Sequence, residues 1–366
     1  AEPISGFNSA VIGEELTEAH NAWQNAYDTL TKKVQVLEAQ LIVWKQIDES
    51  KNELVQWLGE TSDALLNASQ DLSDVESGQS KLNRYKDELP AFYNLKTSLI
   101  SKTAQLVKLN DGKQIPTLES LNKLLEDEFA HVKSIADKLE DITCAVGEQE
   151  RSVRDDMKNA SDTITKIREA VIACDDLTGE NSKILERLKN CQALKNELQN
   201  FSSNLELLKK KIEEMKSSFP AFGDSGLSKE LSSLQIRYDG VSSHANKTES
   251  TLLAFLNKYH MEKFGALQRG VAAHKEKVAW CLPEAGSDRY NLEVKVSSLQ
   301  DVEVGLMDCE TKKTDLDVSL DLLQNVETPE KIKELQLERD KLVTELESLK
   351  NSYLNTKQLL EHNISL

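Results

Sequence analysis

Apolar side chains recur at alternating steps of three and four residues over much of this chain. The clearest stretch runs from Leu227 to Tyr259, where Tyr238, Val241, Leu252 and Phe255 keep one phase. These steps place the apolar residues on one face of an α-helix, so they predict a helix with a single apolar seam, ~50 Å long at 1.5 Å per residue. Such a helix needs partner helices that cover the seam.

The same spacing continues in other stretches, which turn-forming residues separate. Breaks fall at Asn110–Gly112, Asp175–Gly179, Ser218–Gly226 and Pro283–Gly286, and Thr328 with Pro329 is a strong helix start. No stretch shows the alternation of a β-strand. We therefore predict an all-α protein with helices over residues 16–67, 75–106, 116–174, 181–217, 227–280, 287–323 and 329–360.

Local signals predict a cap and a kink in the second helix, and packing of the loop before the fifth helix. Ser73 and Glu76 have the spacing of a capping box, in which the two side chains bind free backbone N–H groups at a helix start. Pro90 lies near the centre of the second helix, where proline removes a backbone hydrogen bond. We expect a kink there, or two helices in place of one. In the loop before Leu227, we expect Phe219 and Phe222 to cover the end of a bundle.

The pattern repeats along the chain. An aromatic residue or leucine stands between apolar neighbours at Trp23, Phe129, Tyr238 and Leu346, with roughly 107 residues between successive members of this column. A second column with the same period consists of Trp57, Ile164 and Val271. A repeat of this length with three helices in each unit predicts tandem three-helix bundles.

This repeat defines the predicted domains. Residues 1–45 form a lead and the last helix of a preceding repeat, and full repeats cover 46–148, 149–257 and 258–366, joined by continuous linker helices into an elongated rod. The predicted core residues are the two columns together with Trp280. Gly147 and Gly265 are the candidate linker hinges, because glycine within a helix costs roughly 1 kcal/mol relative to alanine.

The composition and the lack of known motifs disfavour several classes of function. The formal net charge of −17 disfavours binding to nucleic acid or to an anionic membrane, since both require a basic face. No apolar run approaches the ~18 residues of a membrane span. Five scattered cysteines without a C-x2-C pair suggest reduced thiols, with neither a disulfide framework nor a zinc site. No histidine pair, P-loop or nucleophile elbow occurs, so we expect no catalytic residue, no metal and no cofactor.

At these residues the chain resembles the spectrin-repeat family over nearly its whole length. Trp23, Phe129, Tyr238 and Leu346 match the aromatic position of the family's third helix, and Trp57, Ile164 and Val271 match that of its first. Only Trp23 and Trp57 keep the usual tryptophan, and this erosion is most similar to the repeats of nesprins. The resemblance implies a non-enzymatic, monomeric rod segment that transmits force between nucleus and cytoskeleton. It also implies a cytoplasmic, cytoskeletal location, with nuclear-envelope or cytoskeletal partners and attachment at the outer nuclear membrane through other parts of the protein.

Other interpretations remain open. One repeat could serve as a protein-docking module in a dystrophin-type or spectraplakin-type rod, or a repeat junction could be bent and regulatory. A parallel coiled-coil dimer is disfavoured by the regularly spaced loops. A lipid-bending bundle is disfavoured by the acidic charge.

Overall fold

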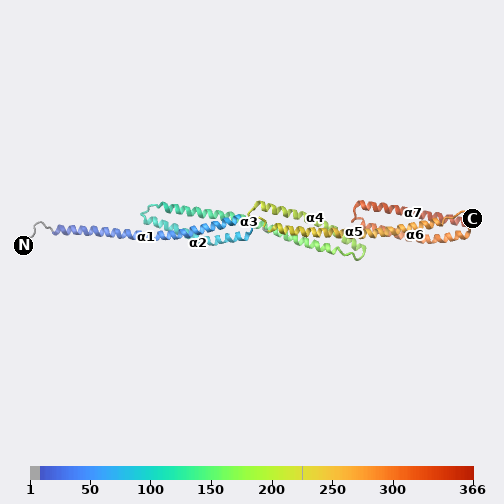
Figure 1. Ribbon diagram of the computed structural model, residues 1–366, viewed down its shortest axis with the longest axis horizontal. Coiled ribbons are helices and arrows are strands. Elements are labelled where there is room, and N and C mark those ends of the chain that lie inside the picture. Colours follow the sequence, from blue (N-terminus) through green and yellow to red (C-terminus); the bar gives the residue numbers. More distant parts are fainter. Residues whose placement is uncertain (1–8, 225) are drawn as a thin grey trace, which may run out of the picture. The chain divides into compact units, whose positions relative to one another are not determined.

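The computed structural model describes residues 9–224 and 226–366, which form seven α-helices and no β-strand (Figure 1). The helices are α1 (Ser9–Gln70), α2 (Val75–Leu109), α3 (Pro116–Ala173), α4 (Asn181–Ser218), α5 (Leu227–Trp280), α6 (Arg289–Leu323) and α7 (Pro329–Ser365). The predicted all-α class is confirmed. Each predicted helix has its counterpart, because a heptad seam is a local signal that the sequence carries over many turns.

The helix starts follow from local chemistry. Thr328 caps α7 by accepting a hydrogen bond from the Lys331 N–H at 3.4 Å, with Pro329 in the first turn. The capping box predicted for α2 is wrong, because the cap is Asp74, whose side chain accepts from the Ser77 N–H at 3.2 Å. The Ser73 hydroxyl donates to the Asp71 carboxylate at 2.6 Å, within the loop that precedes the helix.

Pro90 does not divide α2. The helix runs from Val75 to Leu109 as one element, so the alternative of two helices is wrong. Pro90 has no backbone N–H to donate to the carbonyl of Lys86, four residues earlier in the helix. Both residues are exposed. Water can bind that carbonyl on an exposed helix face, which lowers the cost of the proline.

Contacts between residues divide the chain into two compact units. Unit 1 comprises residues 1–154 and 211–228, and unit 2 comprises residues 155–210 and 229–366. In unit 1, α1, α2 and the first part of α3 pack as a three-helix bundle. Its centre contains the fully buried side chains of Leu54, Leu82 and Leu125, one from each helix.

Unit 2 contains parts of two bundles that share α5. The last part of α5 packs with α6 and α7 around Leu267, Leu299 and Leu346, and these three helices lie side by side in Figure 1. An earlier part of α5 packs with α3 and α4, where Arg237 of α5 donates to the Ser161 hydroxyl of α3 at 2.7 Å. The predicted repeat limits at 148/149 and 257/258 fall inside α3 and α5, and the limits themselves stay predictions.

Candidate functional site

The predicted core residues differ in burial. Trp57, Phe129, Ile164, Val271 and Leu346 are all less than one-tenth exposed. Tyr238 is half-buried and stacks on Phe201 of α4 with 5.8 Å between ring centroids. These residues place the two repeat columns at helix–helix interfaces.

Two of the predicted core residues, both tryptophans, do not lie in the core. Trp23 is 59% exposed, because no helix of the described residues covers its part of α1. Trp280 is 57% exposed, and the prediction that it is a core residue is wrong. At this end of α5 the buried positions are Val278 and Cys281, so the seam leaves Trp280 outside, where its ring lies 5.9 Å from the Lys295 ammonium.

Trp57 is the centre of an aromatic cluster in unit 1. Its ring stacks on Phe92 at 4.4 Å and lies 5.9 Å from Phe129, so one side chain joins all three helices. Its indole N–H donates to the Glu88 carboxylate at 2.7 Å. Hydrogen bonds from Arg84 and then from Trp57 hold the pKa of Glu88 below its ordinary value, so this carboxylate stays charged and keeps its acceptor role.

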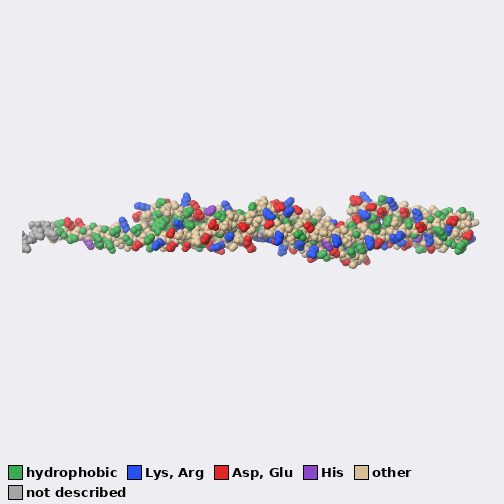
Figure 2. Space-filling view, in the orientation of Figure 1, with side chains coloured by type: hydrophobic (Ala, Val, Ile, Leu, Met, Phe, Trp, Pro, Cys, Tyr) green, Lys and Arg blue, Asp and Glu red, His purple; other side chains and the backbone are tan. Residues whose placement is uncertain are grey.

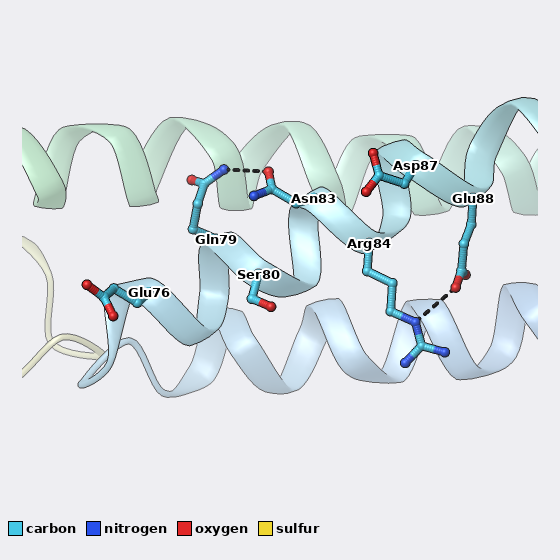
Figure 3. Close-up of a pocket in the computed structure, with 7 residues that line it drawn as sticks. All are labelled: Glu76, Gln79, Ser80, Asn83, Arg84, Asp87 and Glu88. Carbon is cyan, nitrogen blue, oxygen red and sulfur yellow. Dashed lines mark hydrogen bonds and ion pairs between the residues drawn. The ribbon is translucent and has the colours of Figure 1, made fainter.

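A polar surface hollow lies beside this cluster (Figure 3). All seven residues that line it belong to α2, and helices with the colours of α1 and α3 pass behind (Figure 3). Gln79 donates to Asn83 at 3.0 Å and Arg84 pairs with Glu88 at 2.9 Å, so most of its polar groups already bind one another. One exposed helix face with no wall from a second element does not make a catalytic site.

The loops between helices form the joint in unit 1. The Leu72 N–H, in the α1–α2 loop, donates to the Ala221 carbonyl in the α4–α5 loop at 2.7 Å. Leu72 and Phe222 are each 1% exposed. Phe222 therefore packs on a bundle end as the sequence predicts, at the place where these two loops meet.

The joint in unit 2 is built from the α3–α4 region, α5 and the α6–α7 turn. A buried cluster there contains Cys191 of α4, Leu256 of α5 and Val326 of the turn. The Gln192 side-chain amide donates to the Val326 carbonyl at 2.9 Å, and the Asn257 amide donates to the Glu327 carboxylate at 2.8 Å. The turn of one bundle is therefore fastened to two helices of the other.

A buried histidine lies within this joint. His260 is 2% exposed, and its Nδ1 is 2.9 Å from the Ser319 hydroxyl. That hydroxyl donates to the Leu316 carbonyl at 2.7 Å, so the hydrogen in the first bond comes from Nδ1–H of His260. Burial is the main cause that lowers the pKa of His260. Glu338 raises this pKa by a smaller amount and Lys331 lowers it, and the ring is neutral at pH 7.

The seam of α5 shifts phase where this joint begins. The prediction placed Phe255 and Tyr259 on the seam, but Phe255 is 38% exposed, and the buried residues are Leu252, Leu256 and His260. Alternating steps of three and four residues keep the seam on one face of a helix, whereas two successive steps of four move it around the helix. One continuous helix thereby presents different faces to two successive bundles.

The candidate hinges lie inside unbroken helices. Gly147 is within α3, and a side chain there would meet only Val75, at 4.0 Å. Gly265 is within α5, beside the flexible end of Arg269. Whether either glycine bends stays a prediction.

The cysteine thiols are the remaining candidates for reactive groups. All five cysteines are free, and Cys144 alone is exposed. Burial raises the pKa of the Cys191 thiol to about 11, which keeps it protonated and unreactive at neutral pH.

Within residues 9–224 and 226–366 no three His, Cys, Asp or Glu side chains gather as a metal site requires. Among the helices that the structure describes, none is long and apolar enough to cross a bilayer.

The chain is similar to a known muscle protein. No family model matches the chain. It is 40% identical over 355 residues to the "Muscle-specific protein 300 kDa" of Drosophila melanogaster, a match that covers 97% of this chain. The same match covers 3% of the relative, so this chain is similar to one short segment of a very long muscle-specific protein.

The joint residues were missed by sequence reasoning. Gln192 and Val326 are 134 positions apart in the chain, and no local pattern pairs them. His260 carried a signal, since it follows Leu252 and Leu256 at steps of four. A polar residue in an apolar seam could have been recognised as a buried group with a dedicated partner.

Proposed function

We propose that this chain is a non-enzymatic spacer segment of a long muscle scaffold protein, and that it transmits force along helices shared between bundles. The observation that carries the proposal is α5, a single helix of 54 residues that contributes to two hydrophobic cores in unit 2. Pulling on one bundle loads the next through continuous backbone hydrogen bonds, with no flexible linker to absorb the extension.

The joints support this role. The buried cluster around Val326 and the amide contacts of Gln192 and Asn257 tie the α6–α7 turn to the neighbouring bundle. Opening one bundle therefore exposes part of the core of the next. Coupled bundles resist local opening better than independent ones, because their interface free energy adds to that of each unit.

The exposed seam of α1 fits the same proposal. Large apolar side chains stand exposed along its N-terminal half, and they are visible next to the grey residues in Figure 2. They include Leu16, Trp23, Tyr27, Leu30, Val34 and Leu37. We infer that two further helices of the same polypeptide cover this seam in a preceding bundle, as expected for one segment of a much longer protein.

The finer assignment rests on the resemblance to nesprin-type repeats. We propose a cytoskeletal location in muscle, with attachment at the outer nuclear membrane and nuclear-envelope partners supplied by other parts of the parent protein. The similarity to a very long muscle-specific protein supports a scaffold in muscle. Antibody staining of muscle fibres tests the rest, since a signal at the nuclear rim is expected and a signal confined elsewhere would remove the nuclear assignment.

Force spectroscopy on the whole chain tests the spacer role. Lys258 is exposed on α5 close to the joint, so Lys258→Pro interrupts the shared helix without removing a buried side chain, and Lys258→Ala is the matched control. We expect the two bundles that share α5 to unfold together in the unmodified chain and in the alanine variant, and separately in the proline variant. Independent unfolding in all three would contradict force transmission through α5.

A further inference from the structure

A groove between α3 and α5 in unit 2 contains two hollows, one on each side of His244. The first has a volume of about 250 Å³ and is lined chiefly by Arg168, Val171, Ile172, Gly240 and Val241. The second has a volume of about 240 Å³ and is lined chiefly by Cys174, Asp175, Leu177, Thr248 and Leu252. Ile172 is 50% exposed and Leu177 is 41% exposed, so apolar surface faces solvent in both hollows.

The wall between the hollows is fixed. His244 Nε2 lies 2.8 Å from one Asp175 carboxylate oxygen, and the Thr248 hydroxyl donates to the other at 2.6 Å. The loop that carries Asp175 is held by Arg187, which donates to the Asp176 carbonyl at 2.8 Å and to the Thr178 carbonyl at 2.6 Å. A partner would therefore find the groove already formed and would not have to order the loop.

The arrangement is specific to this bundle. When the sequence is aligned on the repeat column that contains Phe129, Tyr238 and Leu346, the positions equivalent to His244 hold Ile135 and Ser352. Ile135 is 9% exposed. A core isoleucine or a short serine cannot form the bond to an aspartate that divides this groove.

The charges around the groove indicate an acidic partner. Arg168 lines the first hollow and Lys247 the second, and both are exposed. Among the described residues neither side chain has an ion-pair partner. One cation beside each apolar hollow complements carboxylates on the surface of a docked partner.

The spacing of the hollows selects a helix. Their lining residues on α5 are centred about six to seven positions apart, which corresponds to ~10 Å at 1.5 Å per residue. Residues i and i+7 of a helix lie on one face at that distance. In an extended strand, side chains on one face are ~7 or ~13 Å apart and would miss one hollow.

The geometry points to a docking site for an acidic amphipathic helix of another protein. Large apolar side chains at i and i+7 fill the two hollows, a small residue between them passes over His244, and carboxylates meet Arg168 and Lys247. This proposal does not rest on the spacer role. The site lies on the outer surface of one bundle and uses none of the hydrogen bonds of the joint, although Cys174 and Leu252 of the second hollow also belong to the buried cluster of the joint.

Gly240 allows a sharp test. A Cβ at this position meets nothing within 4 Å, so Gly240→Trp fills the first hollow without a backbone clash, and Gly240→Ala leaves it open. Peptides with randomised sequence, each long enough for about five helical turns, would be selected on the whole chain by surface display. Synthetic copies of the enriched peptides would then be titrated by fluorescence anisotropy against both variants and against Arg168→Glu, with circular dichroism to verify folding.

We expect the enriched peptides to carry net negative charge with apolar residues at i and i+7. They should lose at least tenfold in affinity for Gly240→Trp and for Arg168→Glu and keep their affinity for Gly240→Ala. Enrichment only of basic peptides, or of peptides that bind the tryptophan variant as well as the unmodified chain, would overturn the proposal. An exhaustive selection that yields no binder would overturn it as well.

Discussion

Single residues set how closely the helices approach each other. At the α5–α6 interface, Gly305 faces the imidazole ring of His274, and the ring occupies the space that a Cβ of residue 305 would need. Gly59, on α1, faces open space. Two glycines within helices therefore have opposite roles, since one permits close packing and the other only lowers helix propensity.

Gly305→Ala should destabilise the protein by about 1–3 kcal/mol, the usual cost of overpacking an interface. Gly59→Ala should instead stabilise it by up to about 1 kcal/mol through helix propensity. Urea unfolding followed by circular dichroism measures both. In a His274→Ala background the penalty at position 305 should disappear, and its persistence there would show that the imidazole is not its cause.

The buried Trp57 and the exposed Trp280 make a direct comparison of burial. Trp57→Ala should cost about 3–5 kcal/mol, since it removes the ring that joins three helices and leaves a cavity. Trp280→Ala should stay within about 0.5 kcal/mol, as expected for a largely exposed side chain. Equal losses in thermal unfolding would place Trp280 in a core and refute the register described for the end of α5.

The buried histidine predicts a pH dependence. Because the folded-state pKa of His260 is lowered, the unfolded chain takes up a proton more readily, near the ordinary histidine value of ~6.5. Stability is therefore present above that value and is lost as pH falls below it. Burial lowers the pKa of His274 as well, which adds to the same trend.

We expect the free energy of unfolding to decline between pH 7 and pH 5, and His260→Asn should flatten this decline. Asparagine can still donate to Ser319 but does not titrate. The matched control is His131→Asn, since His131 is an exposed residue of α3. A pH dependence that His260→Asn leaves unchanged would assign the effect to other groups.

At the scale of whole elements, local periodicity predicted more than long-range pairing did. α5 begins at Leu227 and ends at Trp280 as the seam and the flanking loops predict, because steps of three and four are readable over a few residues. The same reasoning missed the phase shift at Leu256 and His260, since the apolar alternatives Phe255 and Tyr259 fit the heptad equally well. Which of these pairs is buried depends on how α5 contacts its two bundles.

The joints show the same limit. The hydrogen bond between Leu72 and Ala221 joins loops that are distant in sequence, and neither residue carries a distinctive pattern. The apolar loop residue Phe222 was the one usable signal, because a large apolar side chain in a turn-rich segment needs a surface to cover. The sequence therefore indicated that the loop packs, but not against which partner.

Phe222→Ala should loosen the joint in unit 1 by removing a side chain that is 1% exposed. We expect a loss of about 3–5 kcal/mol from the cavity, and faster hydrogen exchange at the Leu72 N–H, whose acceptor is the neighbouring Ala221 carbonyl. Phe255→Ala, at a partly exposed position of α5, should leave that exchange rate unchanged. A Leu72 amide that stays protected in Phe222→Ala would show that the loop contact does not depend on this ring.

For the whole molecule, we propose bundles in series that share helices. The regular repeat of the two residue columns and the two cores joined by α5 support this arrangement within unit 2. The chain is 40% identical to a segment of a very long muscle-specific protein, which fits a scaffold built from such bundles.

Small-angle X-ray scattering coupled to light scattering on the purified chain measures whether the bundles lie in series. We expect a monomer of 41.1 kDa. We also expect a maximum dimension of ~150 Å or somewhat more, from three bundles of ~50 Å in line. A markedly shorter monomer would contradict bundles in series, and a dimer of twice that mass would favour an intermolecular coiled coil.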